Sequence, residues 1–458
     1  MATKKRYTPL EYLLRYIKPI FKWTLLAILI GIACGFVGVA FYYGIAYATD
    51  FRAAHPWVLY LLPVIGLVIV AIYRLSKVEG EGTDDIITSV QEGKVLHLLL
   101  LPAIFISTIL THLGGGSAGR EGAALQIGGE IGNHMGQLAR LDHEDLKITT
   151  MAGMAAFFSA VFGTPLTATI FVVMFINVGY LYEMAVFPCF IASLSAYLIS
   201  MELGVQGFRY PLALPAEQPL FMLRLVALAA LCGLMSSVMC NTFHYTGKLF
   251  AKLKNPYLRA LVGGGIIVAA TLILGNTDYN GAGANIIRLA VEEGVVVPYA
   301  FLLKLLFTAV TLQSGFKGGE IVPTFFIGAT FGAVVGPLLG VPVRFAAAVG
   351  MIALFGSATN TLIAPIFLAI EAFGGMGVHF FALAAAVSYI CSGYTGLYSK
   401  QKIMFSKVRA AARVDRLANQ NEKIRQVSPE AYMRLLRQKR QQRLSESQKA
   451  ERQTKRRQ

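Results

Sequence analysis

The stretch that decides the fold runs from His112 to Gly136 and reads HLGGGSAGREGAALQIGGEIGNHMG. It is rich in glycine, which allows close backbone approach, and Arg120 and Glu121 stand directly before an apolar run. A helix that starts after Glu121 would direct its free N–H groups and the positive end of its dipole at an anion. The alternative is that Arg120 and Glu121 form a purely structural pair at a helix start.

The same pattern returns further along the chain without a gap. A shift of 200 residues aligns Ile86-Ile87 with Ile286-Ile287, Gly119 with Gly319, Ile127-Gly128 with Ile327-Gly328, Gly132 with Gly332, Gly136 with Gly336, and Pro165 with Pro365. We therefore predict two repeated halves, over residues 1–205 and 206–405. Transporters built in this way place their site where broken helices from both repeats converge.

The composition indicates that most of the chain lies within a membrane. Of 458 residues, 55% are hydrophobic and only 14% are charged, whereas soluble domains carry about 25% charged residues. The sequence therefore predicts an all-α polytopic membrane protein and excludes a soluble enzyme and a disordered chain. Apolar stretches that could cross a membrane in whole or in part occupy residues 23–48, 57–73, 146–162, 164–178, 187–199, 220–239, 261–274, 301–312, 322–339, 345–355, 363–373 and 380–392.

The net charge of +16 belongs mostly to the end of the chain. Residues 400–458 hold 18 Lys and Arg against 5 Asp and Glu. We expect residues 406–458 to be a basic cytoplasmic tail, partly helical or disordered, that touches anionic lipid and does not bind nucleic acid. Lys4, Lys5 and Arg6 make the other end basic as well, so the positive-inside tendency places both termini in the cytoplasm of a plasma or inner membrane.

Four motifs together resemble a known family. GREGAALQIGG (119–129) is similar to the GREGP motif of the CLC chloride channels and anion/proton antiporters, and GFKGGEIVPTFFIGATFG (315–332) resembles their GxFxP region. GLYSK (396–400) resembles the segment with the anion-contacting tyrosine, and GEGTD (80–84) stands where the family has GSGIP. The resemblance runs in order through about residues 23–405. It implies the CLC-type fold, with the two halves inverted, and a homodimer.

The resemblance also implies roles for particular residues. Glu121 matches the external gating glutamate, which occupies the anion pathway when ionised and swings out when protonated. Tyr398 matches the tyrosine whose hydroxyl closes the inner side of the site. The anion-binding residues that match helix N-termini are Gly119, Arg120, Gly122, Ile321 and Val322. Uncharged donors suit such a site, because a full positive charge would hold the anion too tightly to release it.

Departures from the family pattern point to one branch. Ala123 replaces the proline of GREGP, Ile321 replaces the phenylalanine of GxFxP, and Glu320 adds an acidic group to the pathway. These features are similar to the branch that exports fluoride in exchange for protons. That branch usually has threonine at Val322 and methionine or asparagine at Glu81.

Glu81 has three readings that stay open. It could be protonated and donate a hydrogen bond to the anion, because desolvation and a nearby anion both raise a carboxyl pKa. It could instead point away in a solvated loop, or carry a second proton.

Other residues carry weaker expectations. Glu202 is a candidate for an internal proton path, against an ordinary helix-end carboxylate. Glu371 is read as structural, paired with backbone groups or a hydroxyl. Phe325 and Phe326 could line the pathway with their positive ring edges, although packing is the usual role of phenylalanine in an apolar helix.

The sequence shows no cofactor or metal pattern. His112, His134 and His143 lack metal-ligand spacing, the five cysteines look like buried free thiols, and no phosphate-binding GxxxxGK[ST] occurs. We expect a transporter and not an enzyme. The leading prediction is exchange of a halide, foremost fluoride, for protons; the alternatives are a chloride/proton antiporter and a passive anion channel.

Overall fold

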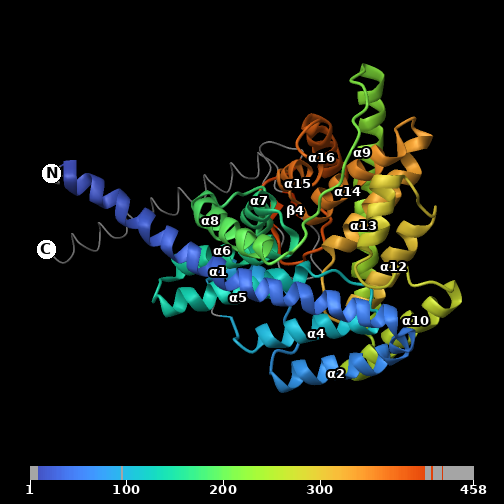
Figure 1. Cartoon of the computed structure of the whole chain (residues 1–458), viewed down its shortest axis with the longest axis horizontal. Helices are drawn as coiled ribbons and strands as arrows, with labels where there is room; N and C mark the ends of the chain where they lie inside the picture. Colours follow the sequence, from blue (N-terminus) through green and yellow to red (C-terminus); the bar gives the residue numbers. More distant parts are fainter. Residues whose placement is uncertain (1–8, 94–95, 408–413, 416–424, 427–458) are drawn as a thin grey trace, which may run out of the picture.

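The protein is described here from a computed structural model, which covers residues 9–93, 96–407, 414–415 and 425–426. Lys4, Lys5, Arg6 and almost all of the predicted tail lie outside these residues. Within them the fold is helical, as predicted, and Figure 1 shows the first-half helices (blue to green) beside the second-half helices (light green to red).

The helices of the first half form nine segments. They are α1 (Pro9–Ala54), the 3-10 helix η1 (Pro56–Leu61), α2 (Leu62–Leu75), α3 (Thr83–Glu92), α4 (Leu100–Gly114), α5 (Glu121–Leu138), α6 (His143–Phe162), α7 (Pro165–Phe175) and α8 (Glu183–Glu202). The second half also has nine segments: α9 (Pro219–Phe250), α10 (Pro256–Leu274), α11 (Ala284–Arg288), the π-helix η2 (Leu289–Glu293), α12 (Ala300–Gln313), α13 (Ile321–Leu338), α14 (Val343–Thr359), α15 (Ala364–Phe373) and α16 (Val378–Cys391).

The helix boundaries follow the predicted repeat. The 18-residue helix α5 begins at Glu121, and the 18-residue helix α13 begins 200 positions later at Ile321. Corresponding helices from the two halves also meet, because α2 packs against α10, α7 against α15 and α5 against α13. Helices that stand about 200 residues apart in the chain therefore meet in the structure.

Glycines let the helices of each half cross closely. A Cβ on Gly153 of α6 would collide with the carbonyl oxygen of Gly128 in α5, and a Cβ on Gly350 of α14 would collide with that of Gly328 in α13. Backbones pack directly at both crossings, which is how membrane helices associate when apolar burial provides no driving force.

Several helices are shorter than a full crossing, as expected for a protein with a buried site. Within the described residues, seven helices are long and apolar enough to span a membrane by length and composition. Six further apolar helices of 10–17 residues include α4, α7 and α15. The predicted apolar stretches did not include α4, although its sequence LLPAIFISTILTHLG is largely apolar.

Small strands and a linker join the halves. β1 (Asn177–Val178) pairs in parallel with β2 (Lys402–Ile403), so the predicted span over residues 164–178 ends as a strand and not as a helix. β3 (Val414–Asp415) pairs with β4 (Arg425–Gln426).

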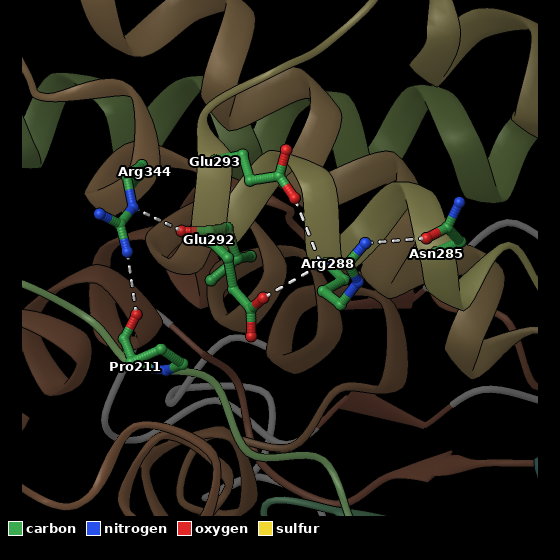
Figure 2. Close-up of polar contacts among 7 residues, drawn as sticks. Pro211, Asn285, Arg288, Glu292, Glu293 and Arg344 are labelled. Carbon is green, nitrogen blue, oxygen red and sulfur yellow. Dashed lines mark hydrogen bonds and ion pairs between the residues drawn. The ribbon is translucent and has the colours of Figure 1, made fainter.

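The linker between α8 and α9 is fixed to the second half. Arg344 of α14 donates to the carbonyl oxygen of Pro211 in this linker at 3.3 Å and to that of Val291 at 3.2 Å (Figure 2). Arg288 at the end of α11 contacts three neighbouring polar side chains, Asn285, Glu292 and Glu293 (Figure 2).

Candidate functional site

The candidate site forms where the two glycine-rich loops before α5 and α13 cross. The amide of Gly119 donates to the carbonyl of Gly319 at 2.8 Å, and the amide of Gly319 donates back to Gly119 at 2.9 Å. These two residues are the partners that the 200-residue shift aligned. Reciprocal bonding of equivalent residues is the arrangement that a two-fold relation between the halves would produce.

A second reciprocal pair of contacts fixes the same loops. The amide of Ser117 donates to the hydroxyl of Thr311 at 3.0 Å, and the amide of Lys317 donates to the hydroxyl of Thr111 at 3.2 Å. Each loop is thus held by the helix that precedes the other loop. The N-termini of α5 and α13 are thereby brought together in the protein interior.

Glu121 begins α5, but its carboxylate lies at the N-terminus of α13. The side chain is fully buried, and its Oε1 accepts a hydrogen bond from the Val322 amide at 2.5 Å. Its Oε2 is buried without a partner. A helix N-terminus favours negative charge, so this carboxylate occupies the kind of position in which an anion binds.

Glycine is required around this carboxylate. A Cβ on Gly119 or Gly319 would collide with the carboxylate oxygens of Glu121, and a Cβ on Gly122 would lie 2.6 Å from the carbonyl oxygen of Gly318. The conspicuous glycines of the two loops therefore make room for the Glu121 side chain and for the crossing of the loops.

Tyr398 supplies a free hydroxyl in the interior. Its ring is 4% exposed, and its hydroxyl has no hydrogen-bond partner within the protein. The ring stands edge-on to Phe175 at a centroid distance of 4.7 Å. The side chain of Gln401 fixes the segment by donating to the carbonyls of Phe175 and Thr359 at 2.7 and 2.9 Å. Tyr398 can thus donate a hydrogen bond to a bound anion.

Arg120 directs its side chain away from the Glu121 carboxylate. Its guanidinium carbon lies 4.8 Å from the centre of the Tyr42 ring and 5.0 Å from that of Phe162. A cavity of about 380 Å³ adjoins it, lined also by Arg209 and Arg288. Glu292 lines the same cavity and pairs with Arg288 at 3.4 Å, which leaves a net positive charge from the arginines that would attract anions.

Glu320 and Glu81 lie at the edges of the site. Glu320 is the N-cap residue of α13, and its Oε2 is buried without a partner. Glu81 lies in the loop between α2 and α3 and is partly exposed, with Lys317 Nζ 3.4 Å from its carbonyl oxygen. Burial, and repulsion from Asp85, raise the pKa of Glu81. This direction agrees with the protonated reading of Glu81, while the partial exposure agrees with the solvated one.

The remaining predicted residues have different surroundings. Phe325 stands edge-on to Phe355 at 5.3 Å, and Phe326 packs against Tyr279 at 6.3 Å, so both rings are buried in aromatic clusters. Glu202 ends α8 with an exposed side chain and is not brought to the carboxylate of Glu121 by any contact of the described residues.

Glu371 fulfils its predicted structural role. Its carboxylate accepts from the amides of Leu166 and Thr167 at 2.8 and 2.9 Å and from the Thr167 hydroxyl at 2.5 Å. It therefore caps the first turn of α7 from the other half of the chain. The cysteines are free, as predicted; all are buried except the partly exposed Cys391.

Sequence reasoning missed one buried cation near the site. Lys304 of α12 is fully buried, and its Nζ donates to the carbonyls of Tyr279 and Gly281 at 3.2 and 2.6 Å. A lysine inside the apolar run FLLKLLF is itself a signal, because a charge at membrane depth needs partners.

Comparison with known proteins decides the family. Residues 65–393 match the family described as voltage gated chloride channel. The chain belongs to the CLC family. It is a multi-pass membrane protein built on the CLC fold.

Named relatives and solved structures agree with this assignment. The chain is 35% identical over 397 residues to a chloride/fluoride channel protein of Pseudomonas syringae pv. tomato, covering 84% of this chain and 87% of the relative. It is 24% identical over 337 residues to the H(+)/Cl(-) exchange transporter ClcA of Salmonella paratyphi B, covering 68% of this chain and 71% of that one.

Two crystal structures share the fold. One is a CLC-type fluoride/proton antiporter with a TM-score of 0.81 and 32% identity, and the match covers 87% of this chain and 100% of that chain. The other is a slow cyanobacterial Cl-/H+ antiporter with a TM-score of 0.68 and 19% identity, and the match covers 81% and 94%. The resemblance to the fluoride branch of the CLC family is confirmed.

Proposed function

We propose that the chain exchanges a halide, foremost fluoride, for protons across a membrane. The observation that carries this proposal is the Glu121 carboxylate hydrogen-bonded to the Val322 amide at the N-terminus of α13. An ionised carboxylate there and a halide compete for the same donor. Only a mobile acid in that position links the passage of the anion to the protonation of a side chain.

The chemistry follows from two charge states of Glu121. When ionised, it accepts the Val322 hydrogen bond and blocks the anion. When protonated, it loses the charge that the α13 N-terminus favours, so a halide can displace it. The carboxyl returns to the site only after it gives up its proton. One proton is moved for each displacement when the carboxyl takes it up from one side of the membrane and releases it to the other.

The other anion contacts would be uncharged donors. The unpartnered Tyr398 hydroxyl and the amides near Gly119, Gly122 and Ile321 could hold a halide without trapping it. The arginine-lined cavity beside Arg120 would raise the local anion concentration at one entrance.

Fluoride is favoured over chloride by the relatives. The 32% identical structure is named as a fluoride/proton antiporter, and the name of the 35% identical bacterial protein gives both chloride and fluoride. The departures at Ala123, Ile321 and Glu320 agree with that branch, whereas Val322 and Glu81 do not follow it. Chloride/proton exchange is the second candidate, because the Salmonella relative is an H(+)/Cl(-) exchange transporter.

Reconstitution tests the proposal. The purified chain is placed in liposomes loaded with fluoride or chloride, and anion efflux and proton influx are recorded together. We expect fluoride efflux to exceed chloride efflux and to drive proton influx. Chloride efflux equal to or above fluoride efflux would remove the fluoride assignment, and anion flux without proton movement would leave a passive channel.

Orientation and assembly complete the proposal. We expect both termini in the cytoplasm, the basic tail in contact with anionic lipid, and a homodimer with one pathway in each subunit. Reporter fusions at each end test the orientation. Mass measurement of the detergent-solubilised protein, corrected for bound detergent, tests the dimer.

A further inference from the structure

A stripe of polar side chains runs along α5 away from Glu121. Gln126, Glu130 and His134 are spaced four residues apart and therefore share one face of the helix. The stripe begins at Gln126, five residues after Glu121, and ends at His134, whose side chain is 24% exposed. It thus runs from the buried first half of α5 toward the surface of the protein.

Glu130 is the member of this stripe that the proposed exchange does not use. Its residue exposure is 0%, and neither carboxylate oxygen has a hydrogen-bond partner of normal geometry. The Leu101 amide is the backbone donor that approaches it. A buried acid with so little compensation is costly at membrane depth and marks a functional group.

The groups around Glu130 are themselves titratable or polar. His134 Nε2 lies 4.0 Å from Glu130 Oε2 and is also buried without a partner. Tyr73 of α2 places a buried, unpartnered hydroxyl where the charges of Glu130 and Glu81 both act on it. Glu130 therefore faces a histidine, a phenol and a second carboxylate.

A second layer of charge lies beyond these groups. Lys317 Nζ stands 3.9 Å from the centre of the Tyr73 ring. The exposed His97 acts on both His134 and Glu81, and Asp85 acts on Glu81 and Lys317. Exposure thus increases along the cluster from Glu130, whose side chain is fully buried, to His134, whose side chain is 24% exposed.

The distance from Glu130 to Glu121 can be bridged by water. Nine residues of α5 rise about 13 Å, which is too far for direct proton transfer. Gln126 lies between them and donates to the Thr83 hydroxyl at 3.1 Å, while its Oε1 is buried without a protein partner. Thr83 in turn lies beside Gly122, next to the gating residue. This amide and hydroxyl can hold connecting water molecules.

We infer that Glu130 is a proton-relay residue that connects Glu121 with the aqueous phase through His134. A proton leaves the His134 imidazolium, or water beside it, and binds the Glu130 carboxylate. The resulting neutral acid passes a proton to water near Gln126, and that water releases one to Glu121. Each transfer leaves its donor deprotonated and ready for the next proton. This inference rests on the proposed antiport.

Substitution of Glu130 by glutamine tests the relay in the full-length protein. Glu130→Gln and wild type are reconstituted side by side, and fluoride efflux and proton influx are measured in the same liposomes. We expect the proton-to-fluoride flux ratio to fall by roughly tenfold or more, because a positioned proton carrier is removed. Fluoride efflux should persist, because Glu121 can still take up and release a proton on the side of the membrane that the relay does not serve.

Three further variants separate a relay from a structural role. Glu130→Asp keeps the carboxyl and should restore most of the proton flux. His134→Gln should slow proton flux and flatten its dependence on pH without altering fluoride efflux at saturating proton supply. Glu144→Gln removes a carboxylate from an exposed ion pair with Lys147, and this control should leave both fluxes unchanged.

The outcomes are distinct. An unchanged flux ratio in Glu130→Gln overturns the relay, and so does an equal loss of both fluxes in Glu130→Asp and His134→Gln. If Glu130→Gln does not fold, those two variants decide. A wild type that moves fluoride without protons overturns the proposed antiport and the relay together. A wild type that exchanges chloride for protons removes only the fluoride assignment, and the relay is then measured with chloride.

Discussion

Replacing Glu121 by glutamine removes the charge of the gating side chain but keeps its shape. The amide oxygen can still accept the Val322 hydrogen bond that the carboxylate accepts at 2.5 Å. It cannot take up a proton at physiological pH. We therefore expect Glu121→Gln to abolish proton coupling and to leave some anion flux.

The magnitude follows from the same hydrogen bond. A bond to a charged group contributes about 1.5–3 kcal/mol and a neutral one about 1 kcal/mol, so the glutamine competes less well for the amide by about 0.5–2 kcal/mol. Since 1.4 kcal/mol corresponds to a factor of about ten, an added halide should bind roughly 2–30-fold more tightly to the variant. The carboxylate oxygen that has no partner in the wild type contributes nothing to this difference.

Two measurements examine this reasoning. Calorimetric titration with fluoride and chloride gives the affinities of wild type and Glu121→Gln, and flux recordings in liposomes give the coupling. Glu144→Gln, which changes an exposed carboxylate, is the matched control. Proton influx driven by fluoride in Glu121→Gln, or weaker anion binding than in the wild type, would refute the competition between the carboxylate and the anion.

Three more substitutions test separate parts of the site. Tyr398→Phe removes the unpartnered hydroxyl. We expect the anion affinity measured by calorimetry to fall about fivefold, which corresponds to the loss of one hydrogen bond of about 1 kcal/mol. An unchanged affinity would exclude the hydroxyl as a ligand. Glu371→Gln weakens the cap on α7 and should lower the free energy of unfolding by about 1–3 kcal/mol. The variant should therefore unfold at a lower temperature in detergent, while the ratio of proton flux to anion flux stays the same. A changed ratio would show a role in transport. Glu81 keeps its proton to a higher pH than a free glutamate, because its pKa is raised. The transport rate of Glu81→Gln should therefore equal that of the wild type at low pH and differ from it as pH rises. Equal rates across the pH range would exclude Glu81 from the pathway.

Much of the architecture could be predicted because similar residues recur in the sequence at a constant spacing of 200 positions. The shift placed Gly119 opposite Gly319 in an alignment, and the structure shows that the two residues bond to each other. The alignment could not supply that contact, since equivalent residues of a duplicated protein need not touch. It depends on the tertiary arrangement of the loops.

Residues of the candidate site could be predicted where they stand in a recognisable sequence motif. Residues whose interest depends on their tertiary contacts could not. Glu121 and Glu371 stand in recognisable segments, and the structure supplies their partners. Glu130 stands in the same QIGGE segment as the recognised motif but was not predicted, because its burial and its closeness to His134 are visible only in the structure. Lys304 was missed for a similar reason: its carbonyl partners come from the loop at Tyr279 and Gly281.

In the proposed exchange, the position of Glu121 requires both halves of the chain to be intact. The carboxylate belongs to the first half, but the amide that binds it belongs to α13 of the second half. The loops that carry them are cross-bonded through Gly119 and Gly319. A displacement of either half would therefore break the contact between the acid and the anion position, and anion passage would no longer depend on protonation of Glu121. Coupling is thus a property of the interface between the repeats, and substitutions that loosen the loop crossing should produce leak before they abolish anion flux.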